Sequence, residues 1–228
     1  MSMGDSLSSI RTLLFDMDNT LFDLEGAQAA SCCEVARFLG DDDGGALYDY
    51  FLRPVRGFES HENIRDYIRD RNLWDDGTFR KACTIFEERR LQQITVYDHV
   101  AETLFELGER GYAMAIVTDA HSRDATKRLE KTGLLPFFRG MVTYDLIGEK
   151  KPSREPFLAA LDMMRSEAHE ALFIGDSPRR DIEPCRSLGI RTVYARYGDT
   201  NFSPGDRVNA DFTIDSLKEL LDILGTSR

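Results

Sequence analysis

The chain has 228 residues, a hydrophobic content of 42% and a formal net charge of −11 at pH 7. This length fits one large domain, or a domain with an insertion, and the composition is ordinary for a protein with a buried core. The acidic balance argues against nucleic acid or an anionic membrane as a partner, and no apolar run approaches the ~18 residues of a membrane span. Residues 1–11 carry no secretory pattern, so we expect a cytoplasmic protein.

Two aspartates separated by one residue follow the first apolar run of the chain. Residues 13–15 are typical of a short buried strand, and Asp16 and Asp18 come directly after it. In an open α/β sheet, ligands bind outside the carboxyl ends of the strands, which is where this pair would lie. A strand end followed by a helix cap would give the same pattern, so the pair needs partners from elsewhere in the chain.

Helical patterns without a convincing strand fill the stretch that follows. We expect helices at residues 24–39, 46–52, 64–73 and 79–94. Gly40, Pro54 and Gly57 would interrupt them. The sequence therefore predicts an all-helical domain at residues 23–95, inserted after the first strand.

Strands and helices alternate from residue 97 onward. Strands are expected at residues 112–117, 141–143, 171–174, 191–194 and 211–214. Helices are expected at residues 99–110, 122–132, 153–164, 181–188 and 217–224, with Asp98 as the N-cap of the first. This alternation is typical of a parallel, doubly wound sheet. The predicted fold class is therefore α/β, with a Rossmann-like core formed by residues 1–22 and 96–228.

Polar residues also end two later strands of the predicted sheet. Thr118 and Asp176 each follow such a strand, and Lys151 stands before Pro152, which disfavours helix at that lysine. Carboxylates gathered at one sheet edge repel each other unless a cation joins them, and hard oxygen ligands suit Mg²⁺. A lysine and a hydroxyl nearby suit a phosphoryl group. These residues indicate metal-assisted phosphoryl chemistry, and the chain contains neither a P-loop nor a GxSxG motif.

The order of these residues resembles the four motifs of the haloacid dehalogenase superfamily of phosphohydrolases. The DxDx[TV] motif stands at residues 16–20, the hydroxyl of the second motif is Thr118, the lysine of the third is Lys151, and GDxxxxD stands at residues 175–181. The resemblance covers almost the whole chain. It points to the branch whose helical cap is inserted after the first motif, and so implies that residues 23–95 are a cap domain.

The resemblance implies a catalytic or metal-binding role for each acidic residue. Asp16 would attack phosphorus and form an aspartyl-phosphate, and Asp18 would protonate the leaving oxygen and later activate water. Asp16, Asp176 and the backbone carbonyl of Asp18 would hold Mg²⁺. Asp181 would lie behind these ligands or bind a water of the metal.

The remaining motif residues would handle the phosphate group. Thr118 and Lys151 would hold the phosphoryl oxygens and offset their charge, while Thr20 would fix the loop by hydrogen bonding. Members of the family that cleave carbon–halogen or carbon–phosphorus bonds lack an acid at the position of Asp18. Because a departing alkoxide needs a proton donor, Asp18 favours a phosphate monoester as substrate.

Two places bear on the choice of substrate. The residue after the second-motif hydroxyl is often Asn in the family, and here it is Asp119, which either caps the following helix or orients a polar group of the substrate. The loop at residues 53–61 corresponds by position to a cap loop that reaches the leaving group. Arg56 and His61 are therefore candidate contacts to an anionic substrate, although a solvated charged loop would look the same.

The expected activity is Mg²⁺-dependent hydrolysis of a small phosphorylated metabolite, such as phosphoglycolate, a sugar phosphate or a nucleotide. A phosphomutase of the β-phosphoglucomutase type would use the same motifs, and a non-catalytic binding protein on this fold is a third possibility. Neither nucleic acid nor a membrane is expected as a partner. Arg179 and Arg180, inside the fourth motif, are expected at the solvated surface.

Overall fold

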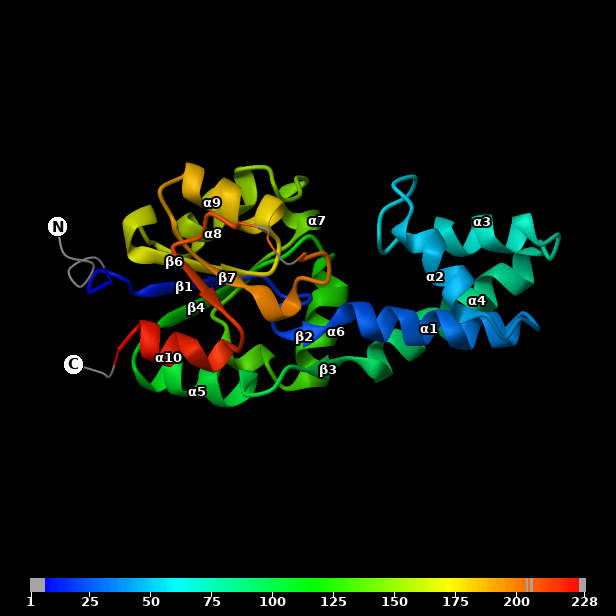
Figure 1. Ribbon diagram of the computed structural model, residues 1–228, viewed down its shortest axis with the longest axis horizontal. Helices are drawn as coiled ribbons and strands as arrows, with labels where there is room; N and C mark the ends of the chain where they lie inside the picture. Colours follow the sequence, from blue (N-terminus) through cyan, green and yellow to red (C-terminus); the bar gives the residue numbers. More distant parts are fainter. Residues whose placement is uncertain (1–6, 204, 206, 226–228) are drawn as a thin grey trace. The chain divides into compact units, whose positions relative to one another are not determined.

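The computed structural model describes residues 7–203, 205 and 207–225 of the chain. The molecule divides into two compact units, Met1–Asp23 with Val96–Arg228 and Leu24–Thr95. The first unit holds the main sheet, and helices make up the second (Figure 1). Among the described residues, no helix is both long and apolar enough to cross a membrane.

The main sheet has six strands in the order β5-β4-β1-β6-β7-β8, and every neighbouring pair is parallel. The strands are β1 Thr12–Phe15, β4 Ala113–Val117, β5 Met141–Val142, β6 Ala171–Gly175, β7 Arg191–Ala195 and β8 Phe212–Ile214. Strand β1 lies between β4 and β6, and all of its residues are buried. An apolar strand buried on both faces is what a sheet with helices on each side requires.

Helices cover both faces of this sheet, as the alternating sequence pattern predicts. They are α5 Val100–Glu109, α6 Ser122–Thr132, α7 Tyr144–Ile147, α8 Glu155–Met164, α9 Glu183–Ser187 and α10 Leu220–Ile223. Figure 1 shows α8 and α9 on one face and α5 and α10 on the other. Beneath α8, the rings of Phe157 and Phe173 meet edge to face with centroids 5.2 Å apart. The predicted α/β fold class is confirmed.

Three details of this unit differ from the sequence-based expectations. Asp98 was expected to be the N-cap of α5, but the cap position is His99, which has a φ of 66° and makes no side-chain cap bond. The helix expected at 181–188 is preceded by a π-helical turn, Pro178–Ile182, and α9 starts only after it. The paired two-residue strands β2 Phe22–Asp23 and β3 Thr95–Val96 are too short to leave a periodic pattern.

The second unit contains four helices close to the predicted positions. They are α1 Leu24–Phe38, α2 Gly44–Leu52, α3 Glu62–Asp70 and α4 Asp76–Gln93. Asp43 and Asp75 cap α2 and α4 by accepting from the backbone N–H groups of Ala46 and Thr78, at 3.0 and 2.7 Å. The unit has its own apolar core, in which the rings of Phe51 and Phe86 stack 5.0 Å apart.

Candidate active site

Three neighbouring strands each deliver one predicted site residue at their carboxyl ends. Asp16 follows β1, Thr118 follows β4 and Asp176 follows β6, and all three are buried. Sheet-like bonding continues to them, because Asp16 N donates to the carbonyl of Ile174 at 2.8 Å and Thr118 N to that of Val142 at 2.9 Å. The sheet therefore fixes the backbone of these residues, and their proximity follows from strand order.

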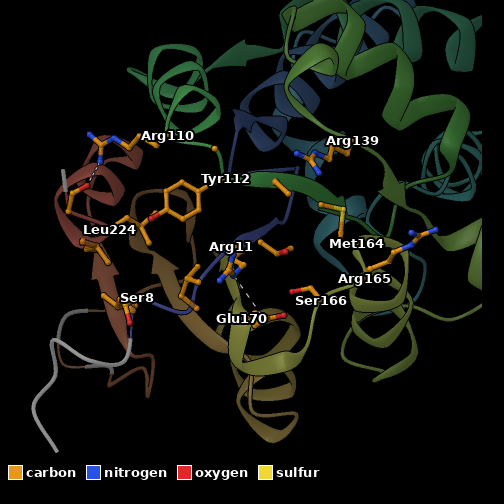
Figure 2. Close-up of a pocket in the computed structure, with 17 residues that line it drawn as sticks. Ser8, Arg11, Arg110, Tyr112, Arg139, Met164, Arg165, Ser166, Glu170 and Leu224 are labelled. Atoms are coloured by element: carbon orange, nitrogen blue, oxygen red, sulfur yellow. Dashed lines mark hydrogen bonds and ion pairs between the residues drawn. The ribbon is translucent and has the colours of Figure 1, made fainter. Parts of the chain in front are cut away.

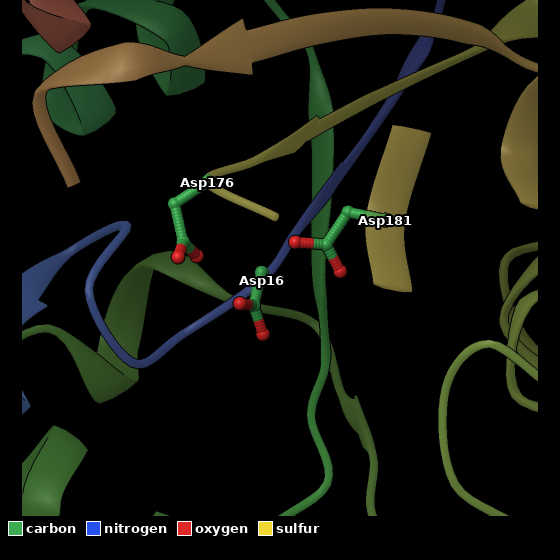
Figure 3. Close-up of side chains that lie close together, drawn as sticks. All are labelled: Asp16, Asp176 and Asp181. Carbon is green, nitrogen blue, oxygen red and sulfur yellow. The ribbon is translucent and has the colours of Figure 1, made fainter. Parts of the chain in front are cut away.

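Asp16, Asp176 and Asp181 form a tight cluster of carboxylates. One oxygen from each lies within 4.8 Å of the others, and Figure 3 shows the three side chains converging. Asp181 comes from the π-helical turn and is fully buried. Gly175 makes room for it, because a Cβ atom there would lie 2.5 Å from Asp181 Oδ2. The GDxxxxD pattern therefore needs glycine at Gly175, because any side chain there would occupy the space of the Asp181 carboxylate.

Lys151 is the cation at the centre of this cluster. Its Nζ donates to Asp16 Oδ1 at 2.5 Å and to Asp181 Oδ1 at 2.7 Å, and its side chain is only 1% exposed. Burial alone would lower the pKa of Lys151, but the carboxylates of Asp16 and Asp181 outweigh it and raise that pKa.

The acidic side chains of the cluster outnumber the ammonium group that they surround. Burial, followed by the charges of the neighbouring acids, raises the pKa of Asp176 well above its ordinary value. The ionised form of this carboxyl is therefore disfavoured unless a further cation joins the cluster. A hard divalent cation with oxygen ligands fits both the charge and the donor set.

The loop after Asp16 is held by contacts from two other segments, which follow β6 and β7. Asn19 adopts a φ of 60°, and the hydroxyl of Thr20 donates to Asp176 Oδ1 at 3.1 Å. The Tyr197 hydroxyl donates to the carbonyl oxygen of Thr20 at 2.7 Å. A Cβ atom at Gly198 would stand 1.6 Å from the carbonyl oxygen of Asn19, so this approach requires glycine.

Asp18 is ion-paired with a buried arginine that the sequence analysis did not single out. Arg128 Nη1 lies 2.9 Å from both carboxylate oxygens of Asp18, and its side chain is 3% exposed. Arg128 occupies the buried face of α6 together with Ala125 and Leu129. The sequence could have indicated Arg128, because an arginine at helical spacing within an apolar stripe is expected to be buried and to need a charged partner.

Asp119 does not cap the following helix, and that expectation is wrong. The first N–H group of α6, at Ser122, is bonded instead by Asp145 Oδ1 at 2.8 Å. Asp119 Oδ1 accepts from the backbone N–H of Lys151 at 2.8 Å, and Asp119 Oδ2 lies 3.5 Å from Arg180 Nη1. Arg180 was expected at the solvated surface, and its side chain is 41% exposed, but it also faces this carboxylate.

The two candidate residues of the 53–61 loop have carboxylate partners within the helical unit. Arg56 Nε lies 3.2 Å from Asp66 Oδ2, and His61 Nε2 lies 2.6 Å from Glu87 Oε1. The hydrogen bonds of His61 with Cys83 and Glu87 raise its pKa from 6.5 to about 10. A contact of Arg56 or His61 with substrate stays a prediction.

A hollow of about 810 Å³ lies at the other edge of the sheet, away from the acid cluster (Figure 2). Its lining includes Arg11 and Thr12 at the start of β1 and Tyr112 at the start of β4. In Figure 2, Arg11 faces Glu170, and the closest atoms of this pair are 3.9 Å apart. None of the predicted site residues lines this hollow, so the candidate site rests on converging side chains and not on cavity size.

Comparison with known families and proteins gives consistent matches over most of the chain. The model of the family described as haloacid dehalogenase-like hydrolase matches residues 13–195. Glyceraldehyde 3-phosphate phosphatase of Methanocaldococcus jannaschii is 27% identical, over 94% of this chain and 97% of the relative. Phosphoglycolate phosphatase of Vibrio parahaemolyticus is 28% identical, over 96% of this chain and 97% of the relative.

A solved structure has the same fold over nearly the full length. The HAD-hydrolase YfnB of Bacillus subtilis, solved bound to magnesium, superposes with a TM-score of 0.76. The two chains are 22% identical, and the match covers 94% of this chain and 98% of YfnB.

Proposed function

Because this chain belongs to the haloacid dehalogenase-like hydrolases and is a phosphatase of that family, we propose that it hydrolyses a small phosphate monoester through an aspartyl-phosphate on Asp16. The observation that carries the proposal is the buried cluster of Asp16, Asp176 and Asp181 around Lys151. The named relatives, a glyceraldehyde 3-phosphate phosphatase and a phosphoglycolate phosphatase, support a small phosphorylated metabolite as substrate.

In this proposal, Asp16 is the nucleophile and Lys151 holds it in place. The hydrogen bond from Lys151 Nζ to Asp16 Oδ1 fixes the orientation of the carboxylate. The same ammonium group offsets the charge that gathers when a phosphoryl dianion approaches a carboxylate. Thr118, at the end of the adjacent strand β4, would contribute its hydroxyl to the phosphoryl oxygens.

Asp18 would donate the proton to the leaving oxygen and later accept one from water. Its carboxylate accepts from Arg128 at 2.9 Å through both oxygens. This ion pair fixes the position of the carboxylate from which Asp18 would transfer the proton.

Asp16, Asp176 and the backbone carbonyl of Asp18 would hold Mg²⁺, with Asp181 beside them. The magnesium-bound neighbour YfnB and the excess negative charge of the cluster support this assignment. The ion, when bound, supplies charge neutralisation for the phosphoryl oxygens. The helical unit would act as the cap, and its 53–61 loop would select the leaving group.

The proposal is tested by screening phosphorylated metabolites with Mg²⁺, comparing kcat/KM between substrates. We expect release of inorganic phosphate without a bisphosphate activator, and loss of that release in EDTA. Asp16→Asn should lower kcat by at least about 10³-fold while circular dichroism still shows the folded protein. Interconversion of sugar phosphate isomers that depends on an activator would identify a mutase instead, and full turnover by Asp16→Asn would remove the assignment of the nucleophile.

A further inference from the structure

Arg180 lies inside the fourth motif, between the two aspartates of the acid cluster. Its backbone is fixed, because Arg180 N donates to Ser177 Oγ at 3.3 Å at the start of the π-helical turn. Its side chain turns toward Asp119, with Nη1 3.5 Å from Oδ2 of that carboxylate. The turn that places Asp181 thus also places a guanidinium at the site.

The charge of Arg180 belongs to the electrostatics of the acid cluster. Burial would lower the pKa of Arg180, but Asp16 and Asp181, followed by further acids of the site, raise it. Its side chain is nevertheless 41% exposed, whereas that of Lys151 is 1% exposed. Arg180 is therefore the cation of the site that an entering ligand can reach from solvent.

The guanidinium retains hydrogen-bonding capacity in this position. Arginine offers five N–H donors in a planar fork, which matches the oxygens of a phosphoryl group. Within the described part of the chain, the side chain of Arg180 makes one ion pair, and its 3.5 Å separation is longer than an ordinary hydrogen bond. Most of the donors are available to a ligand.

Asp119 connects the two cations of the site. One of its oxygens accepts from the backbone N–H of Lys151 at 2.8 Å, and the other faces Arg180. An asparagine at this position could accept from the same N–H group, but it would carry no charge toward Arg180. The ion pair with Arg180 thus gives a physical reason for a carboxylate at residue 119.

Arg180 adds a second positive charge to a site in which Lys151 would otherwise be alone. The acidic side chains of Asp16, Asp119, Asp176 and Asp181 share the site with these two cations. Carboxylates oppose the entry of a phosphate dianion, so loss of the guanidinium should weaken phosphate binding.

We propose that Arg180 binds the phosphoryl group that is transferred, and that Asp119 is the residue that positions it. This inference rests on the proposed phosphatase function and deepens it. Because the phosphoryl group is common to all substrates, Arg180 raises affinity for phosphate monoester dianions whatever their leaving group. It therefore selects the class of ester, whereas the choice of metabolite is made elsewhere.

The first experiment compares Arg180→Gln with the matched control Arg179→Gln, since Arg179 is exposed and lies outside the proposed machinery. We expect Arg180→Gln to raise KM and the inhibition constant of inorganic phosphate by about 10- to 100-fold, as for loss of a charge-assisted hydrogen bond. The factor should be equal for p-nitrophenyl phosphate and for an ester with an anionic leaving group. Arg180→Lys should restore part of the affinity, and the unfolding midpoint should not move.

The second experiment separates the two contacts of Asp119. Asp119→Asn keeps an acceptor for Lys151 N–H and removes only the charge that faces Arg180. It should raise the inhibition constant of phosphate by about threefold to tenfold, and the double variant with Arg180→Gln should show much less than the product of both effects. Multiplication of the two effects would overturn the positioning role of Asp119.

Two results would overturn the binding role of Arg180. They are an unchanged inhibition constant for phosphate, with or without a lower unfolding midpoint, and a loss confined to esters with anionic leaving groups. A wild-type protein that hydrolyses no phosphate ester would instead contradict the proposed function. The two failures are therefore distinguishable in the same set of measurements.

Discussion

The charged residues at the strand ends of the sheet differ in kind from those in the 53–61 loop of the helical unit. At the sheet, Lys151 and Asp181 are completely enclosed, and each depends on the other for compensation. In the loop, Arg56 and His61 are 41% and 40% exposed, and each meets a single carboxylate. Buried charges are costly to change one at a time, while exposed pairs contribute little and can change freely. We therefore expect substitutions to be costly at the strand ends of the sheet and tolerated in the 53–61 loop.

The largest expected effect comes from Lys151→Met, which leaves the carboxylates of Asp16 and Asp181 buried without their cation. Without Mg²⁺, the free energy of unfolding should fall by about 3–5 kcal/mol, and hydrolysis should be lost. Added Mg²⁺ should restore part of this stability, because the ion would supply the missing charge. Urea unfolding with and without Mg²⁺ measures both effects. The neighbouring Lys150 is exposed, and Lys150→Met should change stability by less than about 0.5 kcal/mol. Equal losses of stability for the two lysine variants would contradict the proposed difference between buried and exposed charges.

Gly175→Ala should have the next largest effect, because its Cβ would lie 2.5 Å from Asp181 Oδ2 and displace that carboxylate. The Mg²⁺ concentration for half-maximal activity should rise by about 10- to 100-fold, the range seen when residues that support metal ligands are lost. A suitable control is Gly108→Ala in α5, where a Cβ meets only Met114 Cε at 3.8 Å. That control should gain about 0.5–1 kcal/mol in stability from helix propensity. An unchanged Mg²⁺ requirement in Gly175→Ala would mean that Asp181 does not support the metal.

In the loop, Arg56→Ala should change substrate choice while leaving the chemistry intact. We expect KM to rise by about twofold to fivefold for an ester with an anionic leaving group, which is the range of an exposed charge. A neutral aryl phosphate should show no change. The exposed Arg37→Ala on α1 serves as a control in the same unit. Equal effects on both substrates would remove Arg56 from substrate selection and leave it as a partner of Asp66.

The smallest expected effect is the pH dependence contributed by His61. Because the pKa of His61 is raised from 6.5 to about 10, its stabilising contribution is complete below pH 6.5 and is lost as pH rises through 10. The difference in unfolding free energy between wild type and His61→Gln should thus be greatest near pH 6 and smallest above pH 10. Its size should stay below about 1 kcal/mol, since both His61 and Glu87 are partly exposed. A difference that grows with pH would have the wrong sign for this ion pair.

Local sequence patterns were sufficient to find the elements and the ends of the strands. Apolar runs that stop at a polar residue located Asp16, Thr118 and Asp176, because a buried parallel strand must lose its apolar character where the chain reaches the sheet edge. Helix α6 was predicted with its observed bounds, since Gly133 ends it in the left-handed conformation. Strand ends and helix bounds can therefore be predicted from patterns that span only a few residues.

Contacts between distant segments could not be predicted in this way. Asp18 and Arg128 are separated by 110 positions, and Asp119 and Lys151 by 32. Their pairing depends on which side chains two separately formed elements turn toward each other, and no periodicity encodes that. The same holds for Arg180, because the turn that carries it lies beside Asp119 only in the folded chain.

Gly198 is a position at which this chain tolerates no side chain. There is no room for a side chain against the Asn19 carbonyl oxygen, so this position admits only glycine, and the segment after β7 is held close to the loop after Asp16. Substitutions at Gly198 should not be tolerated, so a change of substrate specificity is more accessible in segments whose side chains are exposed. Libraries intended to redirect the enzyme toward other metabolites should therefore leave residues 196–198 untouched and diversify residues 53–61.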